Sequence, residues 1–358
     1  MHRHIKQYGV RDDARVSDRF GIDARAAARP ELGGVERWAR ELCARLPVLR
    51  PGGYVVLRPP AALAHRAGHA WEQAVLPARA ARLRVAVLLC PANLAPVAFP
   101  RTVVVLHDAA PLRHPGWYSR AYAAWQRRLL PVVARRAMHV ITVSEFSRRE
   151  LGELLGLAPQ RVSVVPGGVD AAFSPAADAD RARAALSLAR PYVLCVASHT
   201  ARKNLGALVP AARALADDGI DVVVAGGHRP QFAAEPELEA LRLLGHVPDD
   251  LLPGVYAGAE AFALPSHYEG FGLPVLEAMA AGTPVVAAAT AALPETCGDA
   301  ARLVPPEGDA IRDALLALLA DPAERARLRA AGLERAARFT WDATARGVDD
   351  VLARALNP

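Results

Sequence analysis

Two glutamates, Glu269 and Glu277, flank the segment GFGLPVL, which contains only small and apolar residues. The apolar run 261–266 before them is typical of a buried strand, and Pro274 suits the first turn of a helix. Amides at the start of a helix attract anions such as a diphosphate. Because a carboxylate repels phosphate, we expect both glutamates to accept hydrogen bonds from hydroxyl groups instead, Glu269 from a sugar and Glu277 from a ribose.

The loop between the glutamates favours a binding site over an ordinary turn. We expect the amides near Phe271, Gly272 and Leu273 to face a ligand, and Gly270 and Gly272 to allow positive φ and close approach of that ligand. Two glutamates alone are better explained by one that caps a helix and one in solvent. With the strand and the glycine loop, the layout matches the needs of a nucleotide diphosphate sugar.

Two cations follow the apolar run 192–197, where they would meet a diphosphate. Of 43 lysines plus arginines, only Lys6 and Lys203 are lysine. Because the chain uses arginine almost everywhere, a lysine suits a role that arginine fills badly, such as a compact point charge on a phosphate. Chance also explains its presence. Arg202 and Lys203 would stabilise the charge that develops on a departing nucleoside diphosphate. The alternative is two solvated residues at a helix start, but cations there oppose the helix dipole unless an anion is bound.

The first half of the chain offers two weaker signals. His107 ends the apolar run 102–107 and precedes Asp108, which is placed to orient the imidazole ring or to approach an acceptor. A lone histidine is usually structural, but a strand end that faces a cleft makes it a candidate site residue. Gly33 and Gly34 precede an expected helix and suit either an ordinary loop or one that closes over a ligand.

Bringing these residues together requires a framework, and the apolar runs predict one. Runs that are apolar throughout are typical of strands buried on both faces of a parallel sheet. They occupy residues 102–107, 139–144, 162–166, 192–197, 221–227, 261–266 and 284–288. Helix signals such as Ser144 and Asp321–Pro322 lie between them. We therefore predict an α/β protein with two Rossmann-like, doubly wound domains that face a cleft at the carboxyl ends of their strands.

The strand–helix alternation breaks once, at residues 164–186, which are rich in proline, glycine and small polar residues. We place an acceptor-side domain at 1–168, a linker at 169–188 and a domain that binds the nucleotide sugar at 189–340. Residues 341–358 are amphipathic and predict a helix that crosses back to the first domain.

Composition excludes several classes of protein. The 358 residues are 52% hydrophobic and 22% charged, which indicates a globular protein. Four scattered cysteines without a CxxC pair predict reduced thiols in the cytoplasm and no zinc site. A net charge of +6 without a basic tail favours an anionic small molecule or a lipid surface over nucleic acid. We find no bilayer-spanning run and no apolar core of a signal peptide.

The segment EGFGLPVLE resembles the E-x7-E motif of the retaining glycosyltransferases of family 4, which have the two-domain GT-B fold. The resemblance covers nearly the whole chain beyond the first eighteen residues and is strongest for members with an R-K-N phosphate motif, many of which use GDP-mannose or a related donor. It is carried by residues 33–46, 88–97, 103–115, 140–151, 196–205, 243–266 and 293–306.

This resemblance implies roles for particular residues. His107 would contact the transferred sugar, Arg202 and Lys203 the diphosphate, and these three with Glu269 would form the catalytic set. Val247 would contact the base through its backbone. The implied donor-binding set is Gly33, Gly34, Arg202, Lys203, Val247, Glu269, Gly270, Phe271, Gly272, Leu273 and Glu277. No cofactor and no divalent metal is required, and GDP-mannose is the favoured donor.

The predicted reaction transfers a hexosyl group, with mannosyl favoured, to a glycan or lipid-linked acceptor in the synthesis of cell-surface polysaccharide or glycoconjugate. One alternative is a non-catalytic sugar-nucleotide-binding subunit of a glycan assembly complex, which would lose His107 or the glycine loop. Another is a sugar-nucleotide epimerase of similar fold, which would need further acid–base carboxylates that the sequence does not identify.

Residues 116–136 interleave aromatic side chains with arginines, which suits a helix resting on an anionic membrane at the inner face of the cell membrane. The same pattern suits a helix with an apolar core face and a solvated basic face, and both interpretations stay open. The residues concerned are Trp117, Tyr118, Tyr122, Trp125, Arg113, Arg120, Arg127, Arg128, Arg135 and Arg136.

Overall fold

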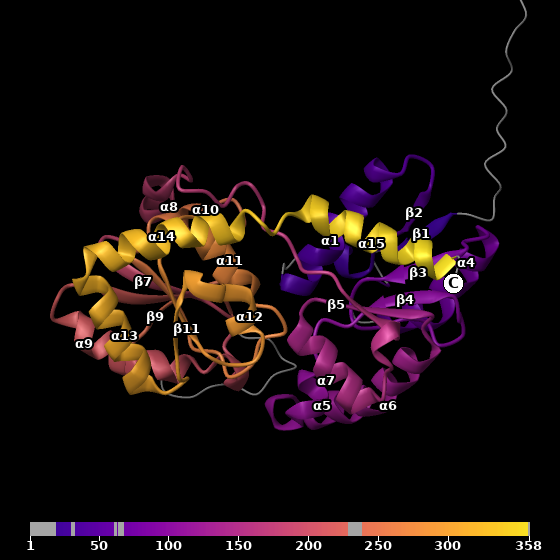
Figure 1. The fold of residues 1–358 in the computed structure, drawn as a ribbon, viewed down its shortest axis with the longest axis horizontal. Helices are drawn as coiled ribbons and strands as arrows, with labels where there is room; N and C mark the ends of the chain where they lie inside the picture. The colour runs from indigo at the N-terminus through magenta and orange to yellow at the C-terminus, as the bar shows by residue number, and fades with distance from the viewer. Residues whose placement is uncertain (1–18, 30–32, 61–62, 64–67, 228–237, 357–358) are drawn as a thin grey trace, which may run out of the picture.

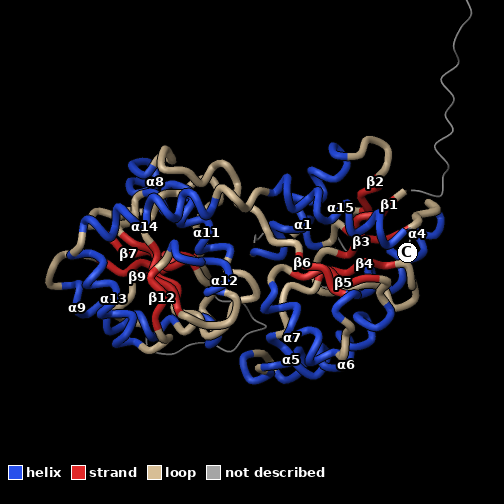
Figure 2. The backbone as a smooth tube through the Cα atoms, viewed as in Figure 1, coloured by secondary structure: helices blue, strands red, loops and turns tan. Residues whose placement is uncertain are grey.

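The computed structural model describes residues 19–29, 33–60, 63, 68–227 and 238–356. The question of whether residues 1–18 are ordered therefore lies outside the described residues. The chain forms two lobes, each with a sheet at its centre and helices around it (Figures 1 and 2). Every strand pairing within both sheets is parallel, so the predicted α/β fold with two doubly wound domains is confirmed. No helix in the described ranges is long and apolar enough to cross a membrane.

The first domain has the strand order β2-β1-β3-β4-β5-β6. Its strands are β1 (Phe20–Asp23), β2 (Tyr54–Leu57), β3 (Val87–Cys90), β4 (Thr102–Val105), β5 (His139–Thr142) and β6 (Val162–Val164). Its helices are α1 (Gly34–Leu49), α3 (Gly68–Ala70), α4 (Leu76–Arg82), α5 (Ala110–Arg113), α6 (Arg120–Arg136) and α7 (Glu145–Leu155). Separate apolar clusters cover the two faces of this sheet, which explains why its strands are apolar throughout.

The second domain has the strand order β12-β11-β10-β7-β8-β9. Its strands are β7 (Tyr192–Val196), β8 (Asp221–Ala225), β9 (Arg242–Gly245), β10 (Ala261–Leu264), β11 (Val285–Ala288) and β12 (Arg302–Val304). Its helices are α8 (Ala179–Ala185), α9 (Val209–Ala216), α10 (Leu252–Ala257), α11 (Leu273–Ala280), α12 (Leu293–Cys297), α13 (Gly308–Ala320) and α14 (Pro322–Ala336). The seven runs predicted as strands are strands, whereas the short strands β1, β2, β3, β9 and β12 were not singled out.

The chain passes between the domains twice, at neighbouring points. Val169 and Thr340 pair in an isolated bridge, and a Cβ on Gly168 would lie 2.2 Å from the backbone nitrogen of Trp341, so only glycine fits there. The last helix, α15 (Trp341–Leu356), then lies along α1 on the first lobe (Figure 1). The Trp341 side chain is buried in the apolar cluster of the first domain.

The predicted linker is shorter than residues 169–188. Helix α8 lies inside that range and begins at an N-cap where Asp178 accepts a hydrogen bond from the amide of Arg181. Ala182 is fully buried against α10, and a Cβ on Gly254 would lie 2.3 Å from the carbonyl oxygen of Asp178. The second half of the expected linker is therefore part of the second domain.

Candidate active site

A cleft of about 640 Å³ separates the two domains. It is bordered by residues that follow β1, β3 and β4 in the first sheet and β7 and β8 in the second, as expected at the carboxyl ends of parallel strands. Six of the predicted site residues line it: Gly33, Gly34, Arg202, Lys203, Leu273 and Glu277. Asp108 and Pro274, which are neighbours of predicted site residues, line it too. The cleft therefore takes its walls from both halves of the chain.

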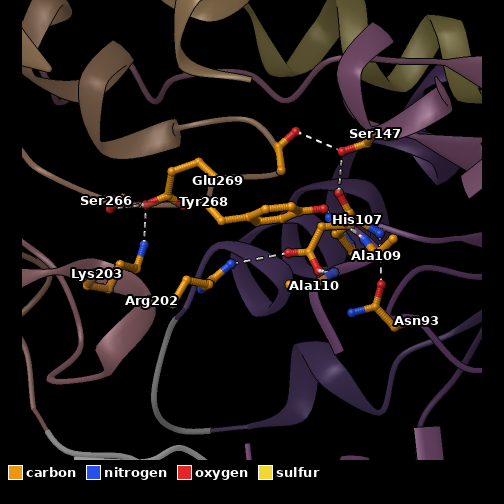
Figure 3. A network of polar contacts seen from close by, with 12 residues as sticks. Asn93, His107, Ala109, Ala110, Ser147, Arg202, Lys203, Ser266, Tyr268 and Glu269 are labelled. Carbon is orange, nitrogen blue, oxygen red and sulfur yellow. Dashed lines mark hydrogen bonds and ion pairs between the residues drawn. The ribbon is translucent and has the colours of Figure 1, made fainter. Parts of the chain in front are cut away.

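Arg202 and Lys203 lie at the end of a short 3₁₀ turn, Ala201–Lys203, after β7. Lys203 Nζ donates a 2.6 Å hydrogen bond to Glu269 Oε1, and Arg202 Nη1 lies 3.3 Å from Asp108 Oδ2 of the first domain (Figure 3). The side chains of Lys203 and Arg202 are only 10% and 15% exposed. The alternative of two solvated cations at a helix start is therefore wrong.

Glu269 is a buried carboxylate held in its charged form. Its Oε1 accepts hydrogen bonds from Lys203 and from Ser266 Oγ at 2.7 Å. Burial alone would raise the pKa of Glu269, but the charges of Lys203 and Arg202 and these hydrogen bonds outweigh it and lower that pKa. Burial and the neighbouring Arg202 in turn lower the pKa of Lys203, against the attraction of Glu269.

Glu277 lies in the second turn of α11 and is bound from both domains. Its Oε1 accepts a 2.9 Å hydrogen bond from Arg37 of α1, and its Oε2 accepts a 2.8 Å hydrogen bond from the Tyr256 hydroxyl. Burial raises the pKa of Glu277, and Arg37 opposes that shift. The sequence did not single out Arg37, although it follows the Gly33–Gly34 pair on the first turn of a helix.

The loop that carries Glu269 contacts the first domain directly. Gly270 does not have positive φ, and a Cβ there would lie 2.5 Å from the carbonyl oxygen of His107. The expectation of a positive φ at Gly270 is therefore wrong, and the backbone of the first domain lies where a side chain at this position would be. Gly272 does have a φ of 100° and is the N-cap of α11.

Two serines of the first domain hold this loop in place. Ser144 Oγ donates a 2.6 Å hydrogen bond to the carbonyl oxygen of Gly270. Ser147 Oγ donates one of 3.1 Å to the same oxygen (Figure 3). Glu295 of the second domain accepts hydrogen bonds from the first amides of α7, a favourable site for a carboxylate. The structure thus joins the two domains around the loop 266–272.

His107 is 9% exposed and is not among the residues that line the cleft. Its Nε2 lies 2.9 Å from the carbonyl oxygen of Pro91, which can only accept, so the proton sits on Nε2 and Nδ1 is left as an acceptor. Burial lowers the pKa of His107, which favours the neutral ring. Asp108 does not orient this ring, because its carboxylate binds Arg202 and the amide of Ala110.

Two further predicted residues, Val247 and Phe271, also lie outside the open cleft. Val247 is buried in the core of the second domain. Phe271 packs edge-on against Phe339, with ring centroids 5.7 Å apart, where the chain returns to the first domain. Because the Phe271 side chain packs between the domains, only the backbone of Phe271 is available for the predicted donor binding.

A buried acidic and basic cluster at the end of β1 was not predicted. Arg25 Nε donates a 2.7 Å hydrogen bond to Glu72, and Asp23 accepts one of 2.9 Å from Trp71 Nε1. Burial and the nearby Glu72 raise the pKa of Asp23 to about 6. The segment FGIDAR, in which Asp23 and Arg25 follow a short strand, was the available signal in the sequence. Glu72, the partner of Arg25, is 47 residues away along the chain.

Comparison with known proteins identifies the chain. Residues 32–173 match the family Glycosyltransferase Family 4, and residues 190–321 match Glycosyl transferases group 1. The chain is 31% identical over 264 residues to the O-antigen chain mannosyltransferase B of Escherichia coli, across 68% of this chain and 67% of that protein. It is 37% identical over 227 residues to a D-inositol 3-phosphate glycosyltransferase of Xylanimonas cellulosilytica, across 58% and 54%.

Solved structures share this architecture. The sucrose-phosphate synthase of Thermosynechococcus elongatus superimposes with a TM-score of 0.74 at 21% identity, across 94% of this chain and 98% of that one. Two parallel sheets facing a cleft, with these matches, define a glycosyltransferase with the GT-B fold. The chain belongs to glycosyltransferase family 4. The aligned region spans between about half and two thirds of the length of the two sequence relatives.

Proposed function

We propose that this protein is a retaining glycosyltransferase that moves a hexosyl group, with mannosyl favoured, from a nucleotide diphosphate sugar to a glycan or lipid-linked acceptor. The observation that carries the proposal is the pair of buried glutamates on either side of the α11 N-terminus, with Arg202 and Lys203 beside them. The 31% identity to a mannosyltransferase supports mannosyl as the transferred group, and GDP-mannose is the donor that we propose. The D-inositol 3-phosphate glycosyltransferase shows that relatives differ in acceptor.

In the proposed complex, the diphosphate binds Arg202, Lys203 and the first amides of α11. The Lys203 ammonium has three donors, so it can hold Glu269 and a phosphate oxygen together. Oε1 of Glu269 already accepts two hydrogen bonds, and Oε2 would accept one from a sugar hydroxyl. Glu277, oriented by Arg37 and Tyr256, would accept one from the ribose.

The proposed chemical step needs no protein nucleophile, cofactor or metal ion. The bond between the sugar C1 and the β-phosphate oxygen breaks, and the acceptor hydroxyl oxygen forms a bond to C1 on the same face. The leaving phosphate takes the hydroxyl proton, so the configuration at C1 is retained. Arg202 and Lys203 stabilise the negative charge on that phosphate. The neutral His107 ring would contact the transferred sugar through Nδ1.

A donor panel tests this proposal. We expect GDP-sugars to raise the melting temperature more than UDP-, ADP- or dTDP-sugars, because a ligand that binds only the folded state stabilises it by mass action. The shift should disappear in Glu277→Ala. NMR of the product from GDP-mannose should show the α configuration of the donor. Inversion at C1 would refute the retaining step, and the absence of a shift with every donor would refute donor binding.

We also propose an electrostatic contact between α6 and an anionic membrane. Arg120, Arg127, Arg128, Arg135 and Arg136 are exposed on this helix, whereas Arg113 is paired with Glu150 and Glu153. The exposed face is therefore basic but not aromatic, because Tyr118 is buried and Tyr122 and Trp125 line the cleft.

Liposome flotation measures that contact. We expect the protein to float with vesicles rich in phosphatidylglycerol at low salt and to dissociate above roughly 0.3 M salt, where surface charges are screened. Arg127→Ala/Arg128→Ala should weaken flotation, while the matched pair Arg327→Ala/Arg338→Ala on the other lobe should not. Equal flotation with neutral vesicles would contradict an electrostatic contact.

A further inference from the structure

The first-domain wall of the cleft is aromatic where it faces the cations of the second domain. Tyr118, Tyr122, Trp125 and Gln126 all line the cleft. The rings of Tyr118 and Tyr122 are 5.5 Å apart at 23°, and those of Tyr122 and Trp125 are 6.3 Å apart at 42°. Residues 122, 125 and 126 share one face of α6 because they are three and four positions apart. The arginines of the same helix lie on its exposed face.

Gln126 lies in this wall with an unsatisfied acceptor. Gln126 is 3% exposed. Burial raises the pKa of Tyr122, and a side-chain hydrogen bond from Gln126 opposes that shift, so the amide NH₂ of Gln126 is the donor. Among the described residues, no donor reaches its Oε1. Buried polar atoms normally have a partner, so an unsatisfied amide oxygen beside a cleft indicates a ligand that supplies a hydroxyl or an N–H group.

The wall is also close to the reacting groups. The charges of Asp108 and Arg202 both act on the pKa values of Tyr118 and Tyr122, and Arg202 Nη1 lies 3.3 Å from Asp108. A ligand on the aromatic rings would therefore lie beside the proposed diphosphate site. A same-face transfer needs the acceptor hydroxyl in that position, next to the leaving phosphate.

We propose that Tyr122, Trp125 and Gln126 form an acceptor subsite for an uncharged pyranose ring, so that the group receiving the sugar is itself a sugar. This inference rests on the proposed function. The C–H groups on one face of a pyranose carry slight positive charge and pack on the negative faces of aromatic rings, while a ring hydroxyl satisfies Gln126 Oε1. None of the three side chains is charged, so the surface that they offer suits an uncharged ring.

Saturation-transfer NMR with methyl α-D-mannopyranoside and methyl α-D-glucopyranoside tests the subsite directly, with GDP present. We expect Trp125→Ala to abolish transfer of saturation to the methyl hexosides. Trp117→Ala is the matched control, because Trp117 stacks on His114 with centroids 4.0 Å apart and does not line the cleft. The control should retain the signal. Equal loss in both variants, or a full signal in Trp125→Ala, would overturn the subsite.

Steady-state kinetics provide a second readout that a loss of packing alone would not reproduce. Gln126→Met keeps the side-chain length, and we expect it to raise the KM for an oligosaccharide acceptor about tenfold, as for one lost hydrogen bond. The KM for donor in acceptor-free hydrolysis and the GDP-induced thermal shift should stay within twofold of wild type. A parallel rise in the donor KM would assign the wall to the nucleotide base and overturn the inference.

These readouts separate the subsite from the proposed function. If the wild-type protein shows no thermal shift with any nucleotide sugar, the proposed function fails. If the wild-type protein binds donor but Trp125→Ala and Gln126→Met accept sugars as wild type does, only the subsite fails.

Discussion

Replacing Lys203 with methionine is expected to reduce kcat by about 100- to 1,000-fold, the usual loss when one preorganised group that stabilises developing charge is removed. Lys203 lies on the cleft wall, and it is one of two cations where the leaving phosphate is proposed to bind. Single-turnover transfer from a radiolabelled donor measures this change. A loss of less than about tenfold would place the diphosphate elsewhere.

The same substitution should destabilise the fold, because Glu269 would keep a buried charge without its ion-pair partner. Side-chain exposure is 10% for Lys203 and 8% for Glu269, and removal of one partner of such a pair costs about 3–5 kcal/mol. The double variant Lys203→Met/Glu269→Gln should regain most of that free energy of unfolding but none of the activity. Recovery of activity in the double variant would contradict the proposed role of Lys203.

The stability difference between wild type and Lys203→Met should depend on pH. Because the pKa of Glu269 is lowered below 4.5 in the folded protein, its carboxylate stabilises the fold above that value. This contribution is lost as the pH falls through the folded pKa. The difference in unfolding free energy should therefore be largest near neutral pH and shrink below pH 4.5. Urea denaturation across that range measures it, and a constant difference would contradict the ion pair.

Arg37→Ala is expected to weaken donor binding about 10- to 100-fold, the effect of losing a hydrogen bond to a charged group. Arg37 Nη1 lies 2.9 Å from Glu277 and its side chain is 16% exposed. Without Arg37, burial would raise the pKa of Glu277 further, and a protonated carboxyl would be a poorer acceptor for a ribose hydroxyl. Calorimetric titration with the nucleotide sugar that gives the largest thermal shift measures the change.

Arg45→Ala is the matched control for that experiment. Arg45 is on the same helix and is also paired, with Glu41 and Asp342, but at 36% exposure and away from the interdomain cleft. Donor affinity should not change in it. A double-mutant cycle of Arg37→Ala with Glu277→Gln should show strong non-additivity, because both residues belong to one contact. Additive effects would mean that Arg37 does not act through Glu277.

Much of the fold could be predicted from the sequence. Seven of the strands were predicted because burial on both faces of a sheet requires a run of apolar residues, as at β7 and β10. The start of α11 was predicted because Gly272 and Pro274 fix its geometry within three residues. Strands β9 and β12 were missed because they are only partly buried and therefore need no continuous apolar run.

The sequence by itself thus determined the α/β fold class, seven of the strands, the start of the helix between Glu269 and Glu277, and the positions of Arg202 and Lys203 after β7. Only the tertiary structure decided what these groups contact. Arg37 and Glu277 are 240 residues apart in the chain. The backbone of His107 in the other domain leaves no room for a side chain at position 270. The aromatic residues of α6 were equally compatible with a membrane contact in the sequence, whereas in the structure Tyr122 and Trp125 line the interdomain cleft. Local patterns report local geometry, whereas contacts between domains depend on how two independently folded sheets dock.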